Sequence, residues 1–469
     1  MPPFATGAHP SAVSRRTKHP TGGAGDVVTL NVGGQIFQTT RQTLAAAGPA
    51  SILSSPPPFL DRDPHLFSPL LSLLRSGRVP TPNPNPSFSI ADLIQEAEFY
   101  GIDPSLLTAT ASHFDAFDLT RALALPLPGR DPVSAVHVSG TGSVHVAHGG
   151  KITSFDWSLS TKSTILTRFP AVDSLLTLTP SLVAAGAVDF SGLQILNLGS
   201  GSVKETLTWD GCPPGSGSAV QAIGASPDHL FGSFESTRRT ASGIVGFDRA
   251  TLRPSVELGR REIFGAELDS AIPATKLKWI GGSNLLLASG SHAGPSGLSG
   301  NVRLWDVRSA SPVWEISEKV DCFADLAASD SLSAIFKIGV SSGEVFMCDL
   351  RRLSADQPWV GIGRGMVQGN GKGCLIGCHA DKVFVSRGGD LEVWSEVVMG
   401  GGGVRVGEDG VGPNERVMRR NVLGRREDLS GRNGRKRIVR MGFGGRRMVV
   451  VRKDEEQCVE VWESSVGRN

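Results

Sequence analysis

The chain of 469 residues contains 58 glycines and 29 prolines, and its 47 basic and 45 acidic side chains leave a net charge of +2. Glycine and proline at this level disfavour a helix bundle or a coiled coil, because both residues interrupt helices. Hydrophobic residues make up 39% of the chain, so it can bury a large core, whereas a net charge near zero gives no general argument for binding nucleic acid or a membrane.

The six cysteines are irregularly spaced, and none lies among the first 211 residues. This pattern is unlike a secreted disulfide framework and predicts a reducing intracellular compartment, cytoplasmic or nuclear. No run approaches 18 apolar residues, so we expect no transmembrane helix. Residues 1–25 lack the apolar segment of a secretory signal and are rich in glycine and proline, which predicts a disordered tail.

Residues 26–115 begin with two predicted strands. VVTLNV (Val27–Val32) is apolar and β-branched, and QIFQTT (Gln35–Thr40) follows after Gly33 and Gly34. Glycine reaches positive φ angles without steric cost, so the pair predicts a hairpin. A phosphate-binding loop is the alternative, but no lysine follows at the spacing of a Walker motif.

Two helices are predicted next. Asp63 is a suitable N-cap before Pro64, and Gly77 can cap the C-terminus. A second helix begins at Ser89, with Asp92 three residues on. The apolar residues at helical spacing, which we expect to face the core, are Leu66, Phe67, Leu70, Leu71 and Leu74 in the first helix and Ile90, Leu93, Ile94, Ala97 and Tyr100 in the second.

Several short sequence motifs follow one another in this region over about 80 residues. They are LNVGG (Leu30–Gly34), Phe37 with Thr39 and Thr40, Thr43 with Leu44, FLDRDP (Phe59–Pro64), LLRSG (Leu73–Gly77) and EAEFYGI (Glu96–Ile102). Together they resemble the α+β BTB/POZ fold, in its potassium-channel tetramerisation subclass. The resemblance implies self-association through polar interfaces and, as in many members, binding to a cullin-3 scaffold.

Asp61, Arg62 and Asp63 resemble the charged signature of that family. The resemblance implies an oligomer or cullin interface at these residues, and helix capping with surface solvation is the alternative. One segment departs from the family pattern. Only Ser54–Pro58 separates Leu53 from Phe59, where the family usually carries a longer segment with a strand. This shortening could alter either interface.

After an expected linker at 116–131, the chain repeats a short pattern through residues 132–467. The copies share a glycine, a few alternating residues, a bulky residue and then an acidic residue or its substitute, and the last copy, Cys458–Glu463, lacks the glycine. The bulky positions are Phe155, Leu196, Phe247, Trp305, Cys348, Trp394 and Trp462. The shorter spacings between them match the roughly 40–45 residues of a four-stranded propeller blade, and the longer ones need loop insertions.

Among the seven copies only Trp305-Asp306 is a literal WD pair, so the repeats resemble a divergent WD40-type propeller. Seven copies predict an all-β seven-bladed ring, and an open pair of β-sheets is the alternative. Closure is favoured because a ring leaves few exposed strand edges. We expect the bulky residues to pack between sheets and a target protein to bind the variable loops.

The segment from Arg416 to Lys453 carries twelve arginines and two lysines but only two acids, Glu427 and Asp428. We expect a basic loop insertion near 416–440, solvated in water. A nuclear-import signal around Arg435-Lys436-Arg437 or a contact with an acidic partner is the alternative. RNA binding is disfavoured, because Phe443 is the one aromatic residue interleaved with the basic ones.

No catalytic constellation rises above background. The glycine-rich run Gly369–Cys374 lacks the first glycine and the Ser or Thr of a phosphate loop. Cys374, Cys378 and His379 have no second ligand pair nearby, so we expect buried residues on blade strands there and no metal site. The sequence therefore predicts a non-catalytic protein with no cofactor.

The two domains together predict a substrate-specific adaptor of a cullin-3 RING ubiquitin ligase. In this hypothesis the BTB domain oligomerises and binds the cullin, and the propeller recruits the target protein for ubiquitination. Tethering raises the effective concentration of the target near the ligase. The alternative is an oligomeric scaffold for protein interactions without a ubiquitin-ligase role.

Overall fold

The structure is a computed structural model. It describes residues 27–48, 51–76, 90–102, 114–157, 159–211, 217–262, 272–294, 297–354, 356–362, 370–397, 416–423, 436–453 and 458–464. The chain divides into two compact units. The first comprises Met1–Leu74 and Pro82–Pro104, and the second comprises Arg75–Thr81 and Ser105–Asn469. The predicted tail at 1–25 lies outside the described residues.

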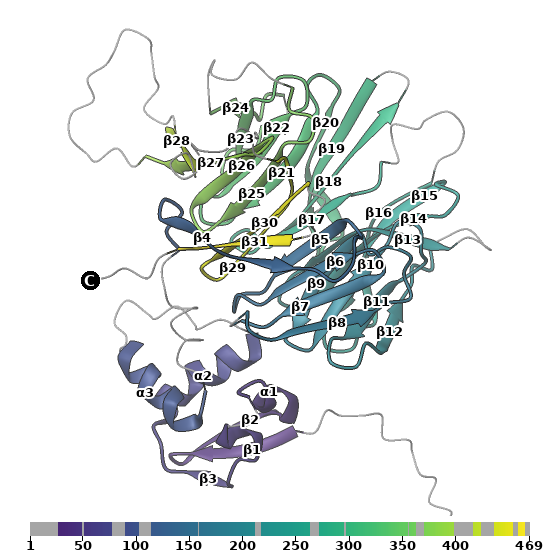
Figure 1. Ribbon diagram of the computed structural model, residues 1–469. Coiled ribbons are helices and arrows are strands. Elements are labelled where there is room, and N and C mark those ends of the chain that lie inside the picture. Colours follow the sequence, from purple (N-terminus) through teal and green to yellow (C-terminus); the bar gives the residue numbers. More distant parts are fainter. Residues whose placement is uncertain are drawn as a thin grey trace, which may run out of the picture. The chain divides into compact units, whose positions relative to one another are not determined.

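The first unit contains the predicted hairpin (Figure 1). Strands β1 (Val27–Val32) and β2 (Gln35–Thr40) pair antiparallel, and the short β3 (Phe59–Leu60) pairs parallel with β1. Gly33 and Gly34 have φ angles of 54° and 90°, as the turn prediction required. A Cβ on Gly33 would lie 2.3 Å from the carbonyl oxygen of Arg62, so this position also needs glycine for space.

The helices pack against this small sheet. They are α1 (Arg41–Ala45), the 3₁₀ turn η1 (Ile52–Ser54), α2 (Pro64–Ser76) and α3 (Ile90–Tyr100). The predicted inward faces are confirmed at Phe67, Leu70, Leu71, Leu74, Leu93, Ala97 and Tyr100, which are buried. Leu66 is only half-buried. The ring of Phe67 lies 5.0 Å from that of Phe37 and 5.3 Å from that of Tyr100, joining sheet and helices. The predicted caps Gly77 and Ser89 lie outside the described residues.

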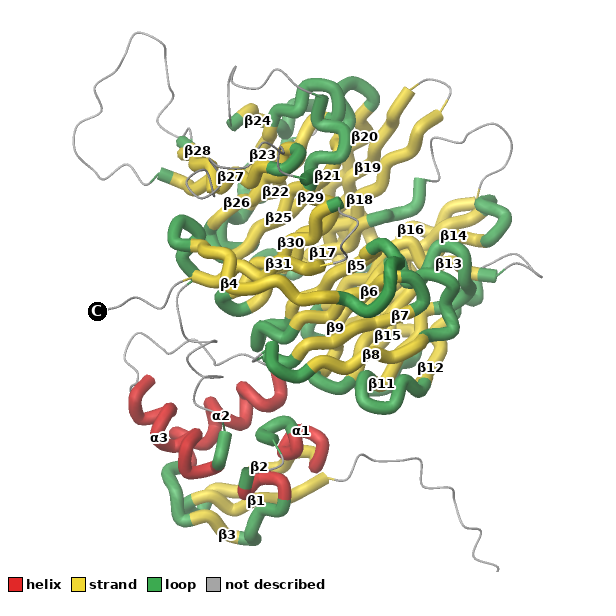
Figure 2. Tube along the Cα trace, in the orientation of Figure 1, coloured by secondary structure: helices red, strands yellow, loops and turns green. Residues whose placement is uncertain are grey.

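The second unit is built from strands (Figure 2), which form seven four-stranded sheets. Blade 1 comprises β5 (Val133–Val138), β6 (Val144–His148), β7 (Lys151–Phe155) and β8 (Lys162–Leu166), blade 2 comprises β9 (Ser174–Thr179), β10 (Leu182–Gly186), β11 (Leu193–Asn197) and β12 (Val203–Leu207), and blade 3 comprises β13 (Ser218–Ala225), β14 (His229–Ser236), β15 (Ala241–Asp248) and β16 (Pro254–Glu262). Blade 4 comprises β17 (Lys276–Ile280), β18 (Leu285–Gly294), β19 (Gly297–Asp306) and β20 (Ser311–Glu318), and blade 5 comprises β21 (Phe323–Ser329), β22 (Ala334–Gly339), β23 (Val345–Asp349) and β24 (Val360–Gly361). Blade 6 comprises β25 (Leu375–His379), β26 (Lys382–Arg387), β27 (Asp390–Glu396) and β28 (Met418–Leu423), and blade 7 comprises β29 (Ile438–Gly444), β30 (Arg447–Arg452), β31 (Cys458–Ser464) and β4 (Leu119–Pro126).

The sheets close into a ring, which confirms the seven-bladed propeller. The first strand of every blade contacts the first strands of both neighbouring blades, including β29 with β5. Antiparallel hydrogen bonding continues within each blade from this inner strand outward. The alternative of an open pair of sheets is therefore wrong.

The linker expected at 116–131 is corrected by β4. This strand pairs antiparallel with β31, from Leu119 opposite Ser464 to Pro126 opposite Cys458, and so completes blade 7. Only Leu119 and Leu125 of its eight residues are buried, so the apolar alternation that would mark a strand is weak in the sequence. The start of the propeller chain and its last strand thus share one sheet.

The seven bulky repeat positions all lie on the third strands of their blades. Each belongs to a different cluster of apolar side chains between two adjacent blades, and these clusters together account for every junction of the ring among the described residues. Phe155, for example, packs with the residues of blades 7 and 1, and Trp305 with those of blades 3 and 4. The predicted packing between sheets is confirmed.

Candidate functional site

The charged segment predicted as an interface connects β3 to α2. Arg62 donates from Nε and Nη2 to the two carboxylate oxygens of Glu96, at 3.1 and 2.6 Å, and its guanidinium lies 4.2 Å from the ring centre of Phe99. Asp63 Oδ1 accepts from the backbone N–H of His65 at 2.8 Å, which confirms the predicted helix cap. Asp61 is exposed. Arg62 and Asp63 thus have structural tasks, and an interface role for the three residues stays a prediction.

Burial determines the electrostatics around Glu96. Its side chain is only 3% exposed, and its hydrogen bond raises the pKa of Arg62. Burial, with the charge of Glu96 as a second cause, also raises the pKa of Tyr100, so the phenol stays protonated at neutral pH. The Arg62–Glu96 pair therefore fixes the β3–α2 connection onto α3.

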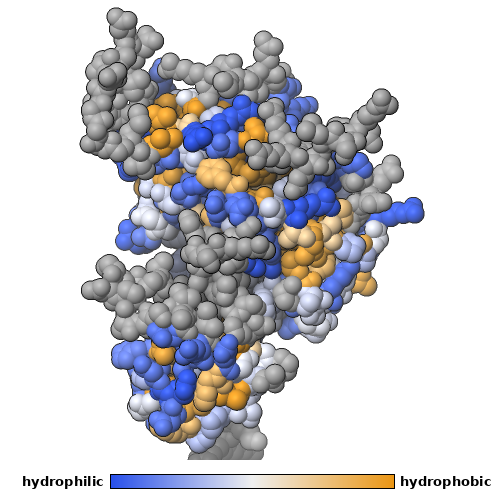
Figure 3. Space-filling model, turned by 60° about the vertical axis from the view of Figure 1, so that its left-hand side comes forward, coloured by the Kyte–Doolittle hydropathy of each residue, from blue (hydrophilic) through white to orange (hydrophobic). Residues whose placement is uncertain are grey.

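The outer face of the β2–β1–β3 sheet carries apolar side chains that sequence reasoning missed as a surface. Ile36 on β2 and Phe59 on β3 both pair with Asn31 on β1, and they are 57% and 51% exposed. Leu30 and Val32 point to the opposite, buried face. Orange apolar patches lie among blue polar ones on this unit in Figure 3. Two large apolar side chains in one row of this sheet are thus in contact with water.

The basic segment differs from the loop insertion expected near 416–440. Residues 418–423 form β28, and residues 438–444 and 447–452 form β29 and β30. Residues 424–435 lie outside the described part. The loop prediction is thus wrong at 418–423 and at 438–440, because Arg419, Arg420 and Arg440 belong to blade strands.

Several of these arginines connect neighbouring blades. Arg416 binds both oxygens of Glu396 at 2.6 and 2.8 Å and donates to the carbonyl oxygen of Leu332 in blade 5 at 2.7 Å. Arg447 is bound to Glu463 at 2.6 Å and donates to the carbonyl oxygen of Gly142 in blade 1 at 2.8 Å. These two arginine side chains, which we expected to face solvent, therefore join neighbouring blades near the C-terminal end of the propeller chain.

Arg437, which belongs to the tripeptide weighed as a nuclear-import signal, also makes a contact within the propeller. Its Nη2 donates to the carbonyl oxygen of Gly373 in the loop before blade 6 at 3.1 Å, while the Lys436 carbonyl accepts from Arg452 at 2.9 Å. Arg435 lies outside the described residues. An import role for this tripeptide stays a prediction.

The residues weighed for metal or phosphate chemistry lie in blade 6 and the loop before it. Cys374 is buried in the apolar cluster between blades 5 and 6 but lies just before β25, whereas Cys378 lies on β25 and is only partly buried against that cluster. The prediction of buried residues on blade strands is thus confirmed for each cysteine only in part. Desolvation raises the pKa of the Cys378 thiol to about 12. His379 Nε2 lies 2.8 Å from the carbonyl oxygen of Gly445. A Cβ on Gly371 would lie 2.0 Å from the carbonyl oxygen of Gly339, so this glycine allows close backbone packing.

Within the described ranges, no group of three or more His, Cys, Asp or Glu residues is arranged to hold a metal ion. None of the described helices is both long and apolar enough to cross a membrane.

Two histidines of blade 1 are held in the neutral form. Burial lowers the pKa of His145 to about 3, and its Nδ1 lies 2.9 Å from Ser154 Oγ. Burial and the positive charge of Lys278 lower the pKa of His137 to about 4, and its Nδ1 lies 2.9 Å from Thr177 Oγ1 in blade 2. These side chains make the inner part of blades 1 and 2 sensitive to acid.

Lowering the pH from 6.5 to 5 should destabilise the propeller, because the unfolded chain binds protons that the folded imidazoles do not. The stabilisation that comes from neutral imidazoles is fully present above the unfolded-state pKa of about 6.5. It decreases as the pH is lowered toward the folded-state pKa values, by about 2 kcal/mol per histidine at pH 5. The thermal midpoint of His145→Asn should depend less steeply on pH than that of the wild type. His292→Gln, at an exposed position, is the control, and a wild-type slope in His145→Asn would contradict the prediction.

Comparisons with known proteins cover both units. The BTB/POZ domain family matches residues 28–110, and the family described as At2g24240-like, C-terminal beta propeller, matches residues 129–342. BTB/POZ domain-containing protein At5g41330 of Arabidopsis thaliana is 49% identical over 452 residues, which cover 94% of this chain and 96% of that protein.

More distant relatives match smaller shares of this chain. At4g30940, also a BTB/POZ domain-containing protein of Arabidopsis thaliana, is 29% identical over 62% of this chain and 68% of its own length. Human BTB/POZ domain-containing protein KCTD3 is 40% identical over 94 residues, which are 18% of this chain and 11% of that protein. The chain is thus similar over nearly its full length to a plant protein and over a short stretch to a human one.

Proposed function

Because the chain belongs to the BTB/POZ domain-containing proteins with a C-terminal β-propeller, we propose that it is a substrate-recruiting adaptor of a cullin-3 RING ubiquitin ligase. The observation that carries the proposal is the pairing, in one chain, of a BTB unit with a closed ring of seven blades. Such a pairing suits an adaptor or a protein-interaction scaffold. The BTB unit binds the cullin and a second copy, and the propeller binds the target.

The cullin step is tested by co-precipitation of the full chain with cullin-3 beside an established BTB adaptor. We expect binding, and weaker binding for Asp61→Lys, because Asp61 is exposed within the charged segment. Glu98→Lys, an equal charge change at an exposed position on α3, should bind as the wild type does. An empty precipitate under conditions that retain the established adaptor would overturn the proposal.

A scaffold without a ubiquitin-ligase role is the second candidate, and the short connection before β3 favours it. Only Ser55–Pro58 separates η1 from the two-residue strand β3, so this edge of the sheet offers little backbone to a partner. The cellular abundance of the bound partner proteins distinguishes an adaptor from a scaffold. If the chain is an adaptor, its bound targets become more abundant when it is removed from cells, whereas the partners of a scaffold keep their abundance.

Self-association is expected to bury the outer face of the β2–β1–β3 sheet. The double variant Ile36→Lys/Phe59→Lys should shift the full chain to the mass of a single copy in light scattering, because charges opposing each other across the contact cost more than the apolar burial contributes. Glu98→Lys should keep the wild-type mass. A wild-type chain that is already monomeric would contradict this prediction.

A further inference from the structure

Four exposed cations are carried by neighbouring segments of blades 6 and 7. Lys372 lies in the loop before β25, Arg437 directly precedes β29, Arg440 lies on β29, and Lys453 directly follows β30. We call these four residues the basic cluster. Three of them belong to the arginine-rich segment, and Lys372 adds a charge from the loop before blade 6.

Hydrogen bonds hold the segments of the basic cluster next to one another. The backbone N–H of Lys453 donates to the carbonyl oxygen of Arg437 at 2.7 Å. Arg437 Nη2 donates at 3.1 Å to the carbonyl oxygen of Gly373, the residue after Lys372. Arg440 Nε donates at 2.6 Å to the carbonyl oxygen of Ser134 in blade 1. The four charges therefore share one surface region, which the backbone of three blades fixes in place.

The charge of the basic cluster is not balanced within the described part of the chain. Its two arginines donate to carbonyl oxygens, and none of its four cations pairs with a described carboxylate. Arg452 differs, because it is bound to Glu460 at 3.1 Å. The nearby segments outside the described residues, 363–369, 424–435 and 454–457, carry five basic and five acidic side chains and so add no net charge. The surface thus has a surplus of positive charge.

The surroundings of the basic cluster suit carboxylates better than nucleic acid. Single-stranded RNA binds proteins largely by stacking its bases on aromatic side chains. Phe443, the aromatic residue interleaved with the basic ones, instead packs in the apolar cluster between blades 6 and 7, with its ring 4.7 Å from that of Phe384. Carboxylates need only charged donors, which the cluster supplies.

We propose that the basic cluster binds an acidic segment of the target protein, a stretch in which several Asp or Glu side chains follow one another. The carboxylates accept from the ammonium groups of Lys372 and Lys453 and from the outward N–H groups of the two arginines. The inference rests on the proposed function, in which the propeller binds a target, and it assigns a surface and a chemical class to that step. Opposite charges also speed the encounter of the two proteins.

Fluorescence anisotropy of a labelled peptide of ten glutamates, titrated with the full chain, tests the surface. We expect saturable binding that weakens as the NaCl concentration rises from about 50 mM to about 300 mM, because salt screens exposed charges. Lys372→Glu combined with Lys453→Glu should weaken binding at least about tenfold, since two attractions become repulsions. Lys372→Gln combined with Lys453→Gln only removes the charges and should bind with intermediate affinity.

The matched control is Lys204→Glu combined with Arg253→Glu, which makes the same charge change at exposed positions in blades 2 and 3 and should bind the peptide as the wild type does. Thermal unfolding checks that each variant is folded. An RNA of ten uridines should bind more weakly than the peptide. Equal peptide binding by the wild type and by Lys372→Glu/Lys453→Glu, or tighter binding of the RNA, would overturn the proposal. Cullin takes no part in this titration, so such a result leaves the cullin step to its own co-precipitation test.

Discussion

Replacing Leu125 by aspartate should open the propeller at its closing blade. Leu125 lies on β4 opposite Val459 of β31, is 4% exposed, and packs in the apolar cluster shared by blades 7 and 1. A carboxylate buried among these apolar side chains costs several kcal/mol, on the order of 3–5. The thermal midpoint of the full chain and its resistance to limited proteolysis should both fall.

Leu123→Asp is the matched control, since it makes the same exchange on the same strand. Leu123 is 37% exposed and pairs with Val461, so its carboxylate can stay in water. We expect a thermal midpoint near that of the wild type for this variant. Equal losses in the two variants would contradict the assignment of β4 to the propeller core.

Replacing Lys337 by methionine should lower the free energy of unfolding nearly as much as Leu125→Asp does. Lys337 Nζ lies 2.7 Å from Glu318 Oε2 across blades 5 and 4, and both side chains are only 6% exposed. The ammonium also lies 4.7 Å from the ring of Trp359 and 5.2 Å from that of Phe346. The change leaves the Glu318 carboxylate buried without its cation, which costs about 3–5 kcal/mol. Urea unfolding of the full chain measures the loss.

Two further variants separate the buried charge from the lost side chain. Lys151→Met breaks the ion pair with Asp131, in which the two side chains are 32% and 46% exposed, and should leave the free energy of unfolding nearly unchanged, because water already solvates both charges. Lys337→Met combined with Glu318→Met removes both charges and should recover most of the stability, because an apolar pair fills the same space. A single Lys337→Met variant as mild as Lys151→Met would contradict the prediction.

The sequence predicted what depends on local pattern. The Gly33-Gly34 turn, the cap at Asp63 and the bulky repeat positions from Phe155 to Trp462 all follow from residue type and spacing along the chain. Each of these features is decided within a few residues of its own position, by a φ angle, an N–H group or an alternating face. For that reason the fold class and the blade number could be read in advance.

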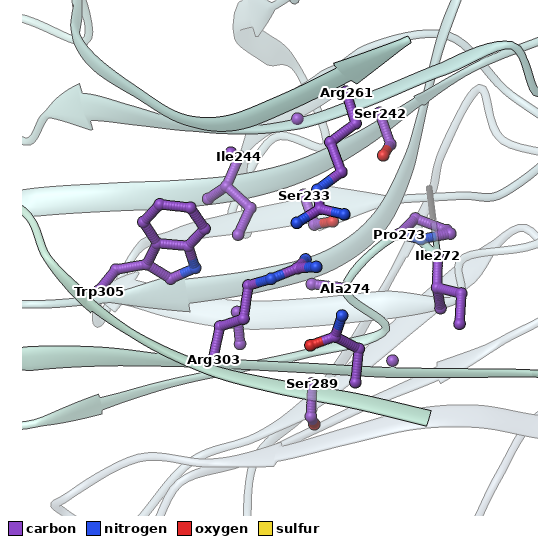
Figure 4. Close-up of a pocket in the computed structure, with 15 residues that line it drawn as sticks. Ser233, Ser242, Ile244, Arg261, Ile272, Pro273, Ala274, Ser289, Arg303 and Trp305 are labelled. Carbon is purple, nitrogen blue, oxygen red and sulfur yellow. The ribbon is translucent and has the colours of Figure 1, made fainter. Parts of the chain in front are cut away.

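What the sequence did not predict depends on distant partners. The edge strand β4 needs the hydrogen bonds of β31, and its own alternation is too weak to mark it. The arginines of blade 7 looked solvated because their acceptors, such as the Gly142 carbonyl, are backbone atoms from other blades. The pocket lined by Arg261 and Arg303 (Figure 4) combines five strands of blades 3 and 4, so no single stretch of sequence contains it.

The closure of the ring by β4 also sets an order of events during synthesis. β4 leaves the ribosome before any blade, and its partner β31 is the last propeller strand to follow. Until then β4 has no neighbouring strand, and other chains or chaperones can engage either of its edges, while the BTB unit can already fold. A truncated mRNA whose coding sequence ends before Cys458 yields a propeller that lacks β31 and cannot close its ring. Ring closure thus distinguishes finished chains from interrupted ones, and only finished chains would present an intact binding face.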